Sequence, residues 1–143
     1  MLSKQANHAL KALLELAAEP ERWRSTHELA SVQQLPEPML EQILLRLRRA
    51  GVLVARRGRR GGYRLACSPG ELSLAAVLIG LGEAAGARGR TETTPTDKVT
   101  RALERSLDRA RLQALEDLRL EDLLFDLRSA EAGATSEAGL LLG

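Results

Sequence analysis

The sequence has few aromatic residues, a single cysteine and no long apolar run. Aromatic side chains account for 2% of its 143 residues and hydrophobic ones for 44%, so the core must consist of Leu, Ala, Val and Ile. This composition argues against an all-β sandwich. Cys67 alone cannot form an intramolecular disulfide, and no stretch approaches the roughly 18 apolar residues of a membrane span. The N-terminus lacks the apolar segment of a signal peptide, so we expect a cytoplasmic protein that does not bind a membrane.

The sequence also lacks the residue clusters of enzymes and metal sites. His8 and His27 are its only histidines, and neither has a cysteine or a second histidine at metal-ligand spacing. Serines and acidic residues are present without a recognisable nucleophile motif. We therefore expect no catalytic residues, no metal ligands and no cofactor.

Positive charge is concentrated in the first half of the chain. Residues 1–67 contain 12 Lys and Arg against 6 Asp and Glu, whereas residues 68–143 contain 9 against 13. The net charge of +2 therefore combines a basic half, which would attract a polyanion, with an acidic half. The alternative is that the basic excess only keeps the protein in solution.

Three helices with short connections are predicted in the basic half. Apolar residues at three- and four-residue spacing indicate a first helix over residues 3–18. Ser25-Thr26-His27-Glu28 has the pattern of a capping box and begins a short helix over residues 26–33. Pro38 suits the first turn of a third helix, which extends to about residue 50, and Gly51 suits a left-handed cap after it. This order is typical of a helix-turn-helix.

A β-hairpin with an arginine-rich tip is predicted next. Residues 52–55 and 63–66 form its two short strands. Five arginines lie within nine residues: Arg56, Arg57, Arg59, Arg60 and Arg64. So much like charge costs free energy unless an anion neutralises it, and Gly58, Gly61 and Gly62 would let the backbone approach a sugar-phosphate chain closely. A nucleotide-binding loop is the alternative, but the Lys-Ser/Thr pair of a P-loop is missing.

The third helix is predicted to have an apolar face and a face that can enter a major groove. There Gln can bond adenine, Glu can accept from cytosine, and Arg can pair with guanine or bind phosphate. The DNA-contacting residues that we expect on this helix are Pro38, Glu41, Gln42, Arg46 and Arg49. The contacts that we expect elsewhere are those of Lys4, Arg57, Arg59, Arg60, Gly61 and Gly62. An ordinary solvated helix face is the alternative.

The acidic half is predicted to contain an oligomerisation element. An apolar helix over residues 72–83 and a loop over 84–96 precede a long helix over 97–118. The apolar seam of the long helix is too extensive to be buried against one small domain, so a partner helix should cover it. The seam consists of Val99, Leu103, Leu107, Ala110, Ala114 and Leu115. A short amphipathic element is expected over residues 120–127.

The expected fold is thus mainly α-helical with a small β-hairpin. A winged helix-turn-helix DNA-binding domain would occupy residues 1–83 and a loop residues 84–96. The dimerisation helix and the amphipathic element would occupy residues 97–128, and a flexible tail residues 129–143.

The sequence resembles the Rrf2 family of winged-helix regulators, which includes the IscR, NsrR and CymR types. The resemblance covers about residues 1–127, and its most specific parts are Leu40-Glu41-Gln42, Leu47-Arg48 and the hairpin from Arg57-Gly58 to Gly61-Gly62-Tyr63. It implies a homodimer, held by the long C-terminal helix, that binds a near-palindromic operator in double-stranded DNA. It also implies that an arginine of the wing, Arg57 or Arg59, reaches into the minor groove. A repressor is the expected role.

One departure from the family is large. Cluster-binding members have three closely spaced cysteines in the loop before the dimerisation helix, where this sequence has none. Because thiolates are the usual ligands of an iron–sulfur cluster, we expect a regulator without one. Cys67 is then expected to be a small, partly buried hydrophobe rather than a redox switch.

Two other modes of action stay open. The acidic half and the segment Leu140-Leu141-Leu142 would suit a regulator that acts mainly by docking to a protein partner. A small molecule could instead bind between the winged domain and the dimerisation helix, near residues 74–81 and 84–90.

Overall fold

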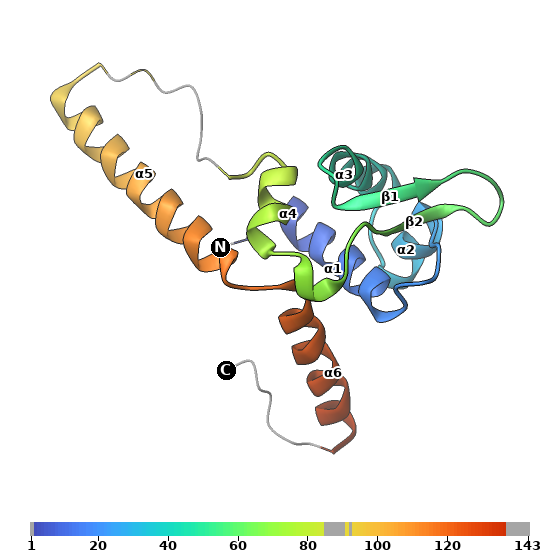
Figure 1. Cartoon of the computed structure of the whole chain (residues 1–143). Helices are drawn as coiled ribbons and strands as arrows, with labels where there is room; N and C mark the ends of the chain where they lie inside the picture. Colours follow the sequence, from blue (N-terminus) through green and yellow to red (C-terminus); the bar gives the residue numbers. More distant parts are fainter. Residues whose placement is uncertain (1, 85–90, 92, 137–143) are drawn as a thin grey trace.

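The computed structural model describes residues 2–84, 91 and 93–136. Three helices come first, a two-stranded hairpin follows, and three further α-helices complete the described chain (Figure 1). The elements are α1 (Lys4–Ala18), α2 (Thr26–Gln33), α3 (Glu37–Arg49), β1 (Leu53–Arg56), β2 (Gly62–Leu65), a 3-10 turn η1 (Pro69–Glu71), α4 (Leu74–Gly80), α5 (Pro95–Glu116) and α6 (Leu120–Ser136). The expected fold class, mainly helical with a small hairpin, is confirmed.

Local signals position the helix-turn-helix as expected. At the start of α2, Ser25 and Glu28 form the predicted capping box. The next helix, α3, begins one residue before Pro38. Gly51 follows the end of α3 with the left-handed φ of +83° that its position predicted.

The first strand of the hairpin, β1, begins and ends one residue later than expected. The second strand, β2, begins and ends one residue earlier. β1 and β2 are antiparallel, with Leu53 opposite Leu65. Val52, which we expected to begin the first strand, donates its backbone N–H to the carbonyl of Leu47 in α3 at 2.9 Å. This bond satisfies a carbonyl that the helix end leaves without an intrahelical partner. It also attaches the hairpin directly to α3.

The helix α4 is shorter than expected because its N-terminal flank pairs with a distant segment. The N–H of Leu74 donates to the carbonyl of Leu118, and the N–H of Leu120 donates to the carbonyl of Leu72, both at 2.9 Å. These bonds hold the backbone extended just before α4 and connect it to the α5–α6 turn. Beyond the C-terminal end of the helix, Gly82 adopts a φ of +77°.

The helix α5 begins earlier than residue 97, where we expected it. Thr94 and Asp97 form a second capping box, and Pro95 occupies the first helical position, where its missing N–H needs no partner. The structure describes all of α5, and none of its residues is buried.

The helix α6 is longer than expected. We predicted a short element that ends at residue 127 and a flexible tail from residue 129, but the helix continues to Ser136. The prediction was wrong because residues 128–136 contain Arg, Glu and three Ala, which favour helix, and a single glycine. Residues 137–143, with the Leu140-Leu141-Leu142 segment, lie outside the described residues.

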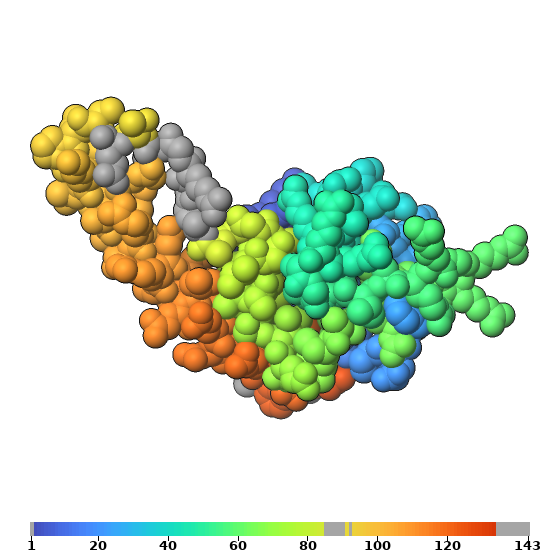
Figure 2. Space-filling view, turned by 45° about the horizontal axis from the view of Figure 1, so that its top comes forward, coloured from blue at the N-terminus to red at the C-terminus, as the bar shows by residue number. Residues whose placement is uncertain are grey.

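The core is aliphatic, as the composition predicted. Its largest fully buried side chains are Leu13, Leu16, Leu29, Leu40, Ile43, Leu44, Leu47, Leu53, Leu78, Leu120 and Val77. α6 packs against α1 and adds Leu120 and Leu124 to this core. In contrast, α5 stands away from the core at one end of the molecule, and the hairpin projects from the other end (Figure 1, Figure 2). Within the described residues, no helix is long and apolar enough to cross a membrane.

Candidate nucleic-acid interface

The helix α3 has one buried face and one exposed face, as its sequence predicted. The residues on its buried face, each at most 1% exposed, are Leu40, Ile43, Leu44 and Leu47. Pro38 is exposed, and so are Glu41, Gln42 and Arg49, which leaves the polar groups of these three available for a ligand. α3 packs against β1, and the hairpin extends beyond it, away from α5 (Figure 2).

Arg46 differs from Glu41, Gln42 and Arg49 because a hydrogen bond to the protein holds its guanidinium. The guanidinium donates to the side-chain oxygen of Gln5 in α1. The amide nitrogen of Gln5 donates in turn to Glu83 at 2.7 Å and to the carbonyl of Leu81 at 3.4 Å. Arg46 is still exposed, but its direction is set by α1 and by the segment after α4. No local sequence pattern predicts this network, because its members lie far apart along the chain.

Side chains from α1 and α2 hold the N-terminal end of α3. His8 of α1 lies 3.1 Å from the sulfur of Met39, and His27 of α2 lies 3.0 Å from a carboxylate oxygen of Glu37. Partial burial, with the charges of Lys4 and Lys11, lowers the pKa of His8 below its usual value. This shift favours the uncharged imidazole, which contacts Met39 of α3.

The five arginines of the hairpin divide into two groups. Arg56 and Arg64 bind to the protein: Arg56 donates to the carbonyl of Arg60 at 2.7 Å, and Arg64 donates to Glu21 at 2.7 Å. Arg57, Arg59 and Arg60 are exposed, and their side chains form no hydrogen bond or ion pair within the described part of the chain. The three unpaired arginines are the ones that we predicted to contact DNA.

Gly61 and Gly62 have structural roles within the hairpin. A Cβ atom on Gly61 would collide with the backbone of Arg56, and one on Gly62 would collide with the backbone of Arg24. Gly62 also has a φ of +139°, which disfavours other residues. These contacts account for the glycine at both positions without any role in ligand binding. A close approach of the backbone to DNA at these residues stays a prediction.

The sequence did not predict the support beneath the hairpin. Arg24 is 6% exposed and lies 3.2 Å from Glu28 and 3.8 Å from Glu15. Its backbone pairs with that of Tyr63, with hydrogen bonds of 3.1 and 2.8 Å. The hairpin is thereby attached to the α1–α2 connection. No sequence pattern around Arg24 predicts its burial, because its partners Glu15 and Tyr63 lie on other elements of the fold.

Lys4 is the first residue of α1 and is exposed. Its neighbour Gln5 contacts Arg46, which brings the start of α1 near α3.

The helix α5 exposes most of the apolar seam that its sequence predicted. Val99 is 70% exposed, and Leu103 and Leu107 are each 60% exposed. Ala110 and Ala114 are exposed as well. Leu115 differs, because it is half-buried and packs against the core.

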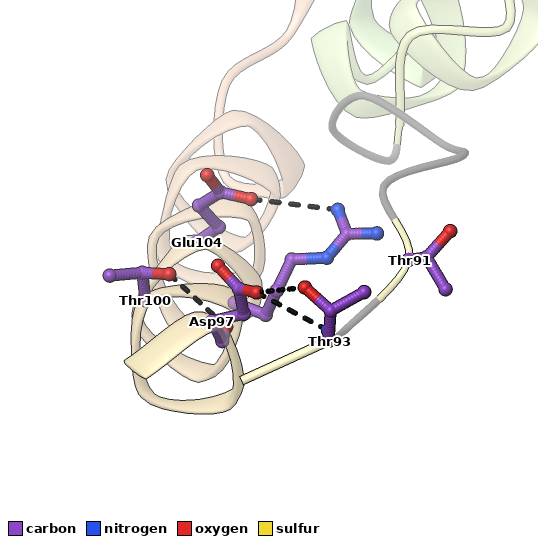
Figure 3. Close-up of a pocket in the computed structure, with 6 residues that line it drawn as sticks. Thr91, Thr93, Asp97, Thr100 and Glu104 are labelled. Atoms are coloured by element: carbon purple, nitrogen blue, oxygen red, sulfur yellow. Dashed lines mark hydrogen bonds and ion pairs between the residues drawn. The ribbon is translucent and has the colours of Figure 1, made fainter. Parts of the chain in front are cut away.

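A polar pocket of about 400 Å³ lies at the N-terminal end of α5 (Figure 3). The Asp97 carboxylate accepts from the Thr93 hydroxyl at 2.8 Å and from the Thr94 N–H at 3.0 Å. These hydrogen bonds lower the pKa of Asp97, the one from the Thr93 hydroxyl most strongly. Arg101 lies 3.7 Å from Glu104 on the pocket wall. The hydrogen bonds of Asp97 with Thr93 and Thr94 cap the helix, so we assign these residues to that structural role.

The region that we considered for a small molecule is only partly described. Leu74, Val77 and Leu78 belong to the buried core, and residues 85–90 lie outside the described residues. A shallow, mainly apolar pocket of about 250 Å³ lies between Ala84 and α5.

Comparison with known families identifies the chain. The Rrf2 family, described as iron-dependent transcriptional regulators, matches residues 2–126. The chain belongs to the Rrf2 family.

Individual relatives agree with this assignment. A Synechocystis protein named as an HTH-type transcriptional regulator is 38% identical over 135 residues, which cover 92% of each chain. The structure of T. potens IscR is similar with a TM-score of 0.67 and 27% identity, over 91% of this chain and 90% of that one. The structure of CymR, the global cysteine regulator of B. subtilis, has a TM-score of 0.69 and 27% identity, over 87% and 95%. This Rrf2 protein is thus a transcriptional regulator with a winged-helix DNA-binding fold and is not an enzyme.

The residues of this Rrf2 chain do not fit an iron–sulfur cluster, although the family is described as iron-dependent. Such clusters are held mainly by cysteine thiolates, and the chain contains only Cys67. Burial and the nearby Glu71 raise the pKa of Cys67, which keeps its thiol protonated and a poor ligand at neutral pH. Within the described residues, there is also no group of three or more His, Cys, Asp and Glu side chains that could hold a metal ion.

Proposed function

We propose that this Rrf2 regulator is a homodimer that recognises a near-palindromic operator in double-stranded DNA without an iron–sulfur cluster. The base contacts would come from α3, through Glu41, Gln42, Arg46 and Arg49. Pro38, in the first turn of this helix, would also contact the DNA. The hairpin, here called the wing, would contact the backbone and the minor groove through Arg57, Arg59 and Arg60. Gly61 and Gly62 would allow its close approach, and Lys4 would bind a phosphate outside the groove.

The observation that carries this proposal is the unpaired charge of the wing. Arg57, Arg59 and Arg60 have no anionic partner within the described residues, and they extend from the strand that directly follows α3. Clustered positive charges repel one another unless an anion neutralises them. A DNA backbone supplies closely spaced phosphates and releases counterions when it binds.

The exposed face of α5 supports the dimer. Leu103 and Leu107 are each 60% exposed, and Val99 is 70% exposed. The same face of a second copy would bury these side chains, because a two-fold axis brings identical surfaces together. Dimerisation would also place two α3 helices about one turn of DNA apart.

We further propose that the protein is a repressor. A dimer that occupies adjacent grooves of a promoter would exclude RNA polymerase from the same DNA. Transcription in vitro from a promoter that contains the operator should therefore decrease when the protein is added, and an increase would indicate an activator.

The operator can be selected from a random-sequence DNA library with the wild-type protein and then mapped by hydroxyl-radical footprinting. We expect two protected regions about 10 base pairs apart, which correspond to two recognition helices on one face of the duplex. A library that yields no enriched duplex would contradict sequence-specific binding.

The selected duplex also tests the wing. The Arg59→Ala/Arg60→Ala variant should bind it roughly tenfold or more weakly in about 0.1 M salt, because each protomer loses two charges that neutralise phosphate. The matched control is Arg128→Ala, which removes an exposed charge from α6 and should bind like the wild type. Equal affinity of the wing variant and the wild type would contradict the assignment of the wing.

A further inference from the structure

Trp23, the single tryptophan of the chain, lies next to the wing although it belongs to the α1–α2 connection. Arg24 and Tyr63 pair their backbones as an antiparallel bridge, which places Trp23 opposite Arg64 of β2. Successive residues of an extended segment point to opposite sides. The side chain of Arg24 is buried, so the side chain of Trp23 lies on the outer side of the hairpin.

The guanidinium groups of two wing arginines contact the ring of Trp23. Arg56 lies 4.7 Å and Arg64 lies 4.8 Å from the ring centroid. The two arginines come from different strands, but they share a face, because Arg56 pairs with Gly62 and Arg64 is two residues further along β2. A tryptophan ring is the aromatic side chain that attracts a cation most strongly. Trp23 therefore connects both strands of the wing to the α1–α2 connection.

Gly62 makes this arrangement possible. It pairs with Arg56 across the two strands and lies on the same face of the hairpin as Arg64. A Cβ atom at Gly62 would also collide with the backbone of Arg24, the residue after Trp23. The glycine therefore allows the α1–α2 connection to lie directly against the wing.

The contact with Trp23 extends to the tip of the wing through Arg56. The guanidinium of Arg56, which lies over the ring, donates to the backbone carbonyl of Arg60 at 2.7 Å. This hydrogen bond spans the loop that carries the unpaired arginines. On the other side, Arg64 is fixed by the carbonyl of Pro20 at 3.1 Å and by Glu21 at 2.7 Å.

We infer that Trp23 is a positioning residue for DNA binding, which holds the wing through Arg56 and Arg64 so that Arg57, Arg59 and Arg60 face the DNA. This inference rests on the proposed function. It also assigns different tasks to the five arginines. Arg56 and Arg64 bind to the indole ring and orient the loop, while the other three neutralise phosphate. Trp23 itself acts through the wing and does not contact the duplex.

A double-mutant cycle separates this role from a general effect on folding. Trp23→Leu should weaken binding to the selected duplex about tenfold, since it removes two cation–π contacts from each wing. In the Arg59→Ala/Arg60→Ala background the same substitution should change the affinity less than about threefold, because two of the three charges that Trp23 positions are already absent. A general loss of folded protein would reduce the affinity by the same factor in both backgrounds.

Trp23→Phe is the matched control, because it keeps an aromatic face for the two arginines. It should recover most of the affinity that Trp23→Leu loses. Circular dichroism melting of each variant measures the folded fraction independently. If Trp23→Leu does not fold, Arg56→Gln replaces it in the cycle, since it removes one of the cations and leaves the α1–α2 connection unchanged.

The outcomes are distinguishable. Wild-type affinity in Trp23→Leu, equal losses in both backgrounds, or no recovery in Trp23→Phe would overturn the inference and leave the proposed function intact. A wild-type protein that binds no duplex would instead overturn the proposed function.

Discussion

At the junction of α1, α2 and the wing, a single residue can take part in more than one interaction. Glu28 closes the capping box of α2 and also lies 3.2 Å from the buried Arg24. Its partial burial raises the pKa, but the hydrogen bonds from the Ser25 backbone and from Arg24 lower it more, so the net shift is downward. The capping box could be predicted because its members are adjacent in sequence. The pairing with Arg24 could not, since only the folded chain shows that Arg24 is buried.

The lowered pKa of Glu28 predicts a pH dependence of stability. A carboxyl with a lowered folded pKa stabilises the protein above its unfolded pKa, here about 4.5, and this contribution is lost as the pH falls through the folded pKa. Glu28→Gln keeps a capping side chain but removes the charge. Because the Glu28 side chain is 42% exposed and solvent screens its charge, the loss in free energy of unfolding should be about 0.5–1 kcal/mol at pH 7. Urea unfolding at several pH values measures this difference, which should shrink below pH 4.5.

Glu19→Gln is the control for this experiment, because Glu19 forms only an exposed ion pair with Arg22. Such pairs contribute little, so its effect should stay within about 0.5 kcal/mol. A difference for Glu28→Gln that is constant from pH 3 to 7 would contradict the role of the charge.

At the scale of elements, the sequence predicts where helices and strands lie better than where they end. The helix-turn-helix and the hairpin follow from capping residues, apolar spacing and glycines close to one another in the chain. The shortened α4 depends instead on backbone bonds between residues 72–74 and 118–120, which no local pattern reveals. For the same reason the sequence identified the charged tip of the wing but not its attachment to Trp23 and Arg24.

The packing of the wing against the α1–α2 connection predicts unequal effects of two glycine substitutions. Gly58 and Gly62 both have positive φ, +106° and +139°, but only at Gly62 would a Cβ atom collide with the backbone. Gly62→Ala should therefore lower the free energy of unfolding by about 2–3 kcal/mol and Gly58→Ala by about 1 kcal/mol. Urea denaturation of the two variants tests this order, and equal losses would contradict the close packing.

At the scale of the whole molecule, two surfaces of different chemistry lie at opposite ends of the described chain. The unpaired charges of the wing lie at one end, and the exposed apolar face of α5 lies at the other (Figure 2). The sequence predicted both surfaces from charge clustering and apolar spacing. It could not predict the second copy's position, which depends on how two such faces fit together.

If the apolar face of α5 forms the dimer interface, negative charges introduced on this face should separate the protomers. Leu103→Glu/Leu107→Glu places two carboxylates on each side of the proposed interface, where burial and repulsion oppose association. Sedimentation analysis should then give a monomer where the wild type gives a dimer. Val32→Glu, which changes an exposed apolar residue of α2, should remain a dimer. A dimeric α5 variant would show that another surface joins the protomers.

The salt dependence of DNA binding tests the central claim most directly. The logarithm of the binding constant for the selected duplex should fall linearly with the logarithm of the salt concentration, with a slope of about −0.9 for each phosphate contact. The slope for the Arg59→Ala/Arg60→Ala variant should be shallower by about 2 for each protomer bound, which corresponds to two lost contacts. A flat response of the wild type, or the same slope for both proteins, would contradict a regulator that holds DNA through its arginine-rich wing.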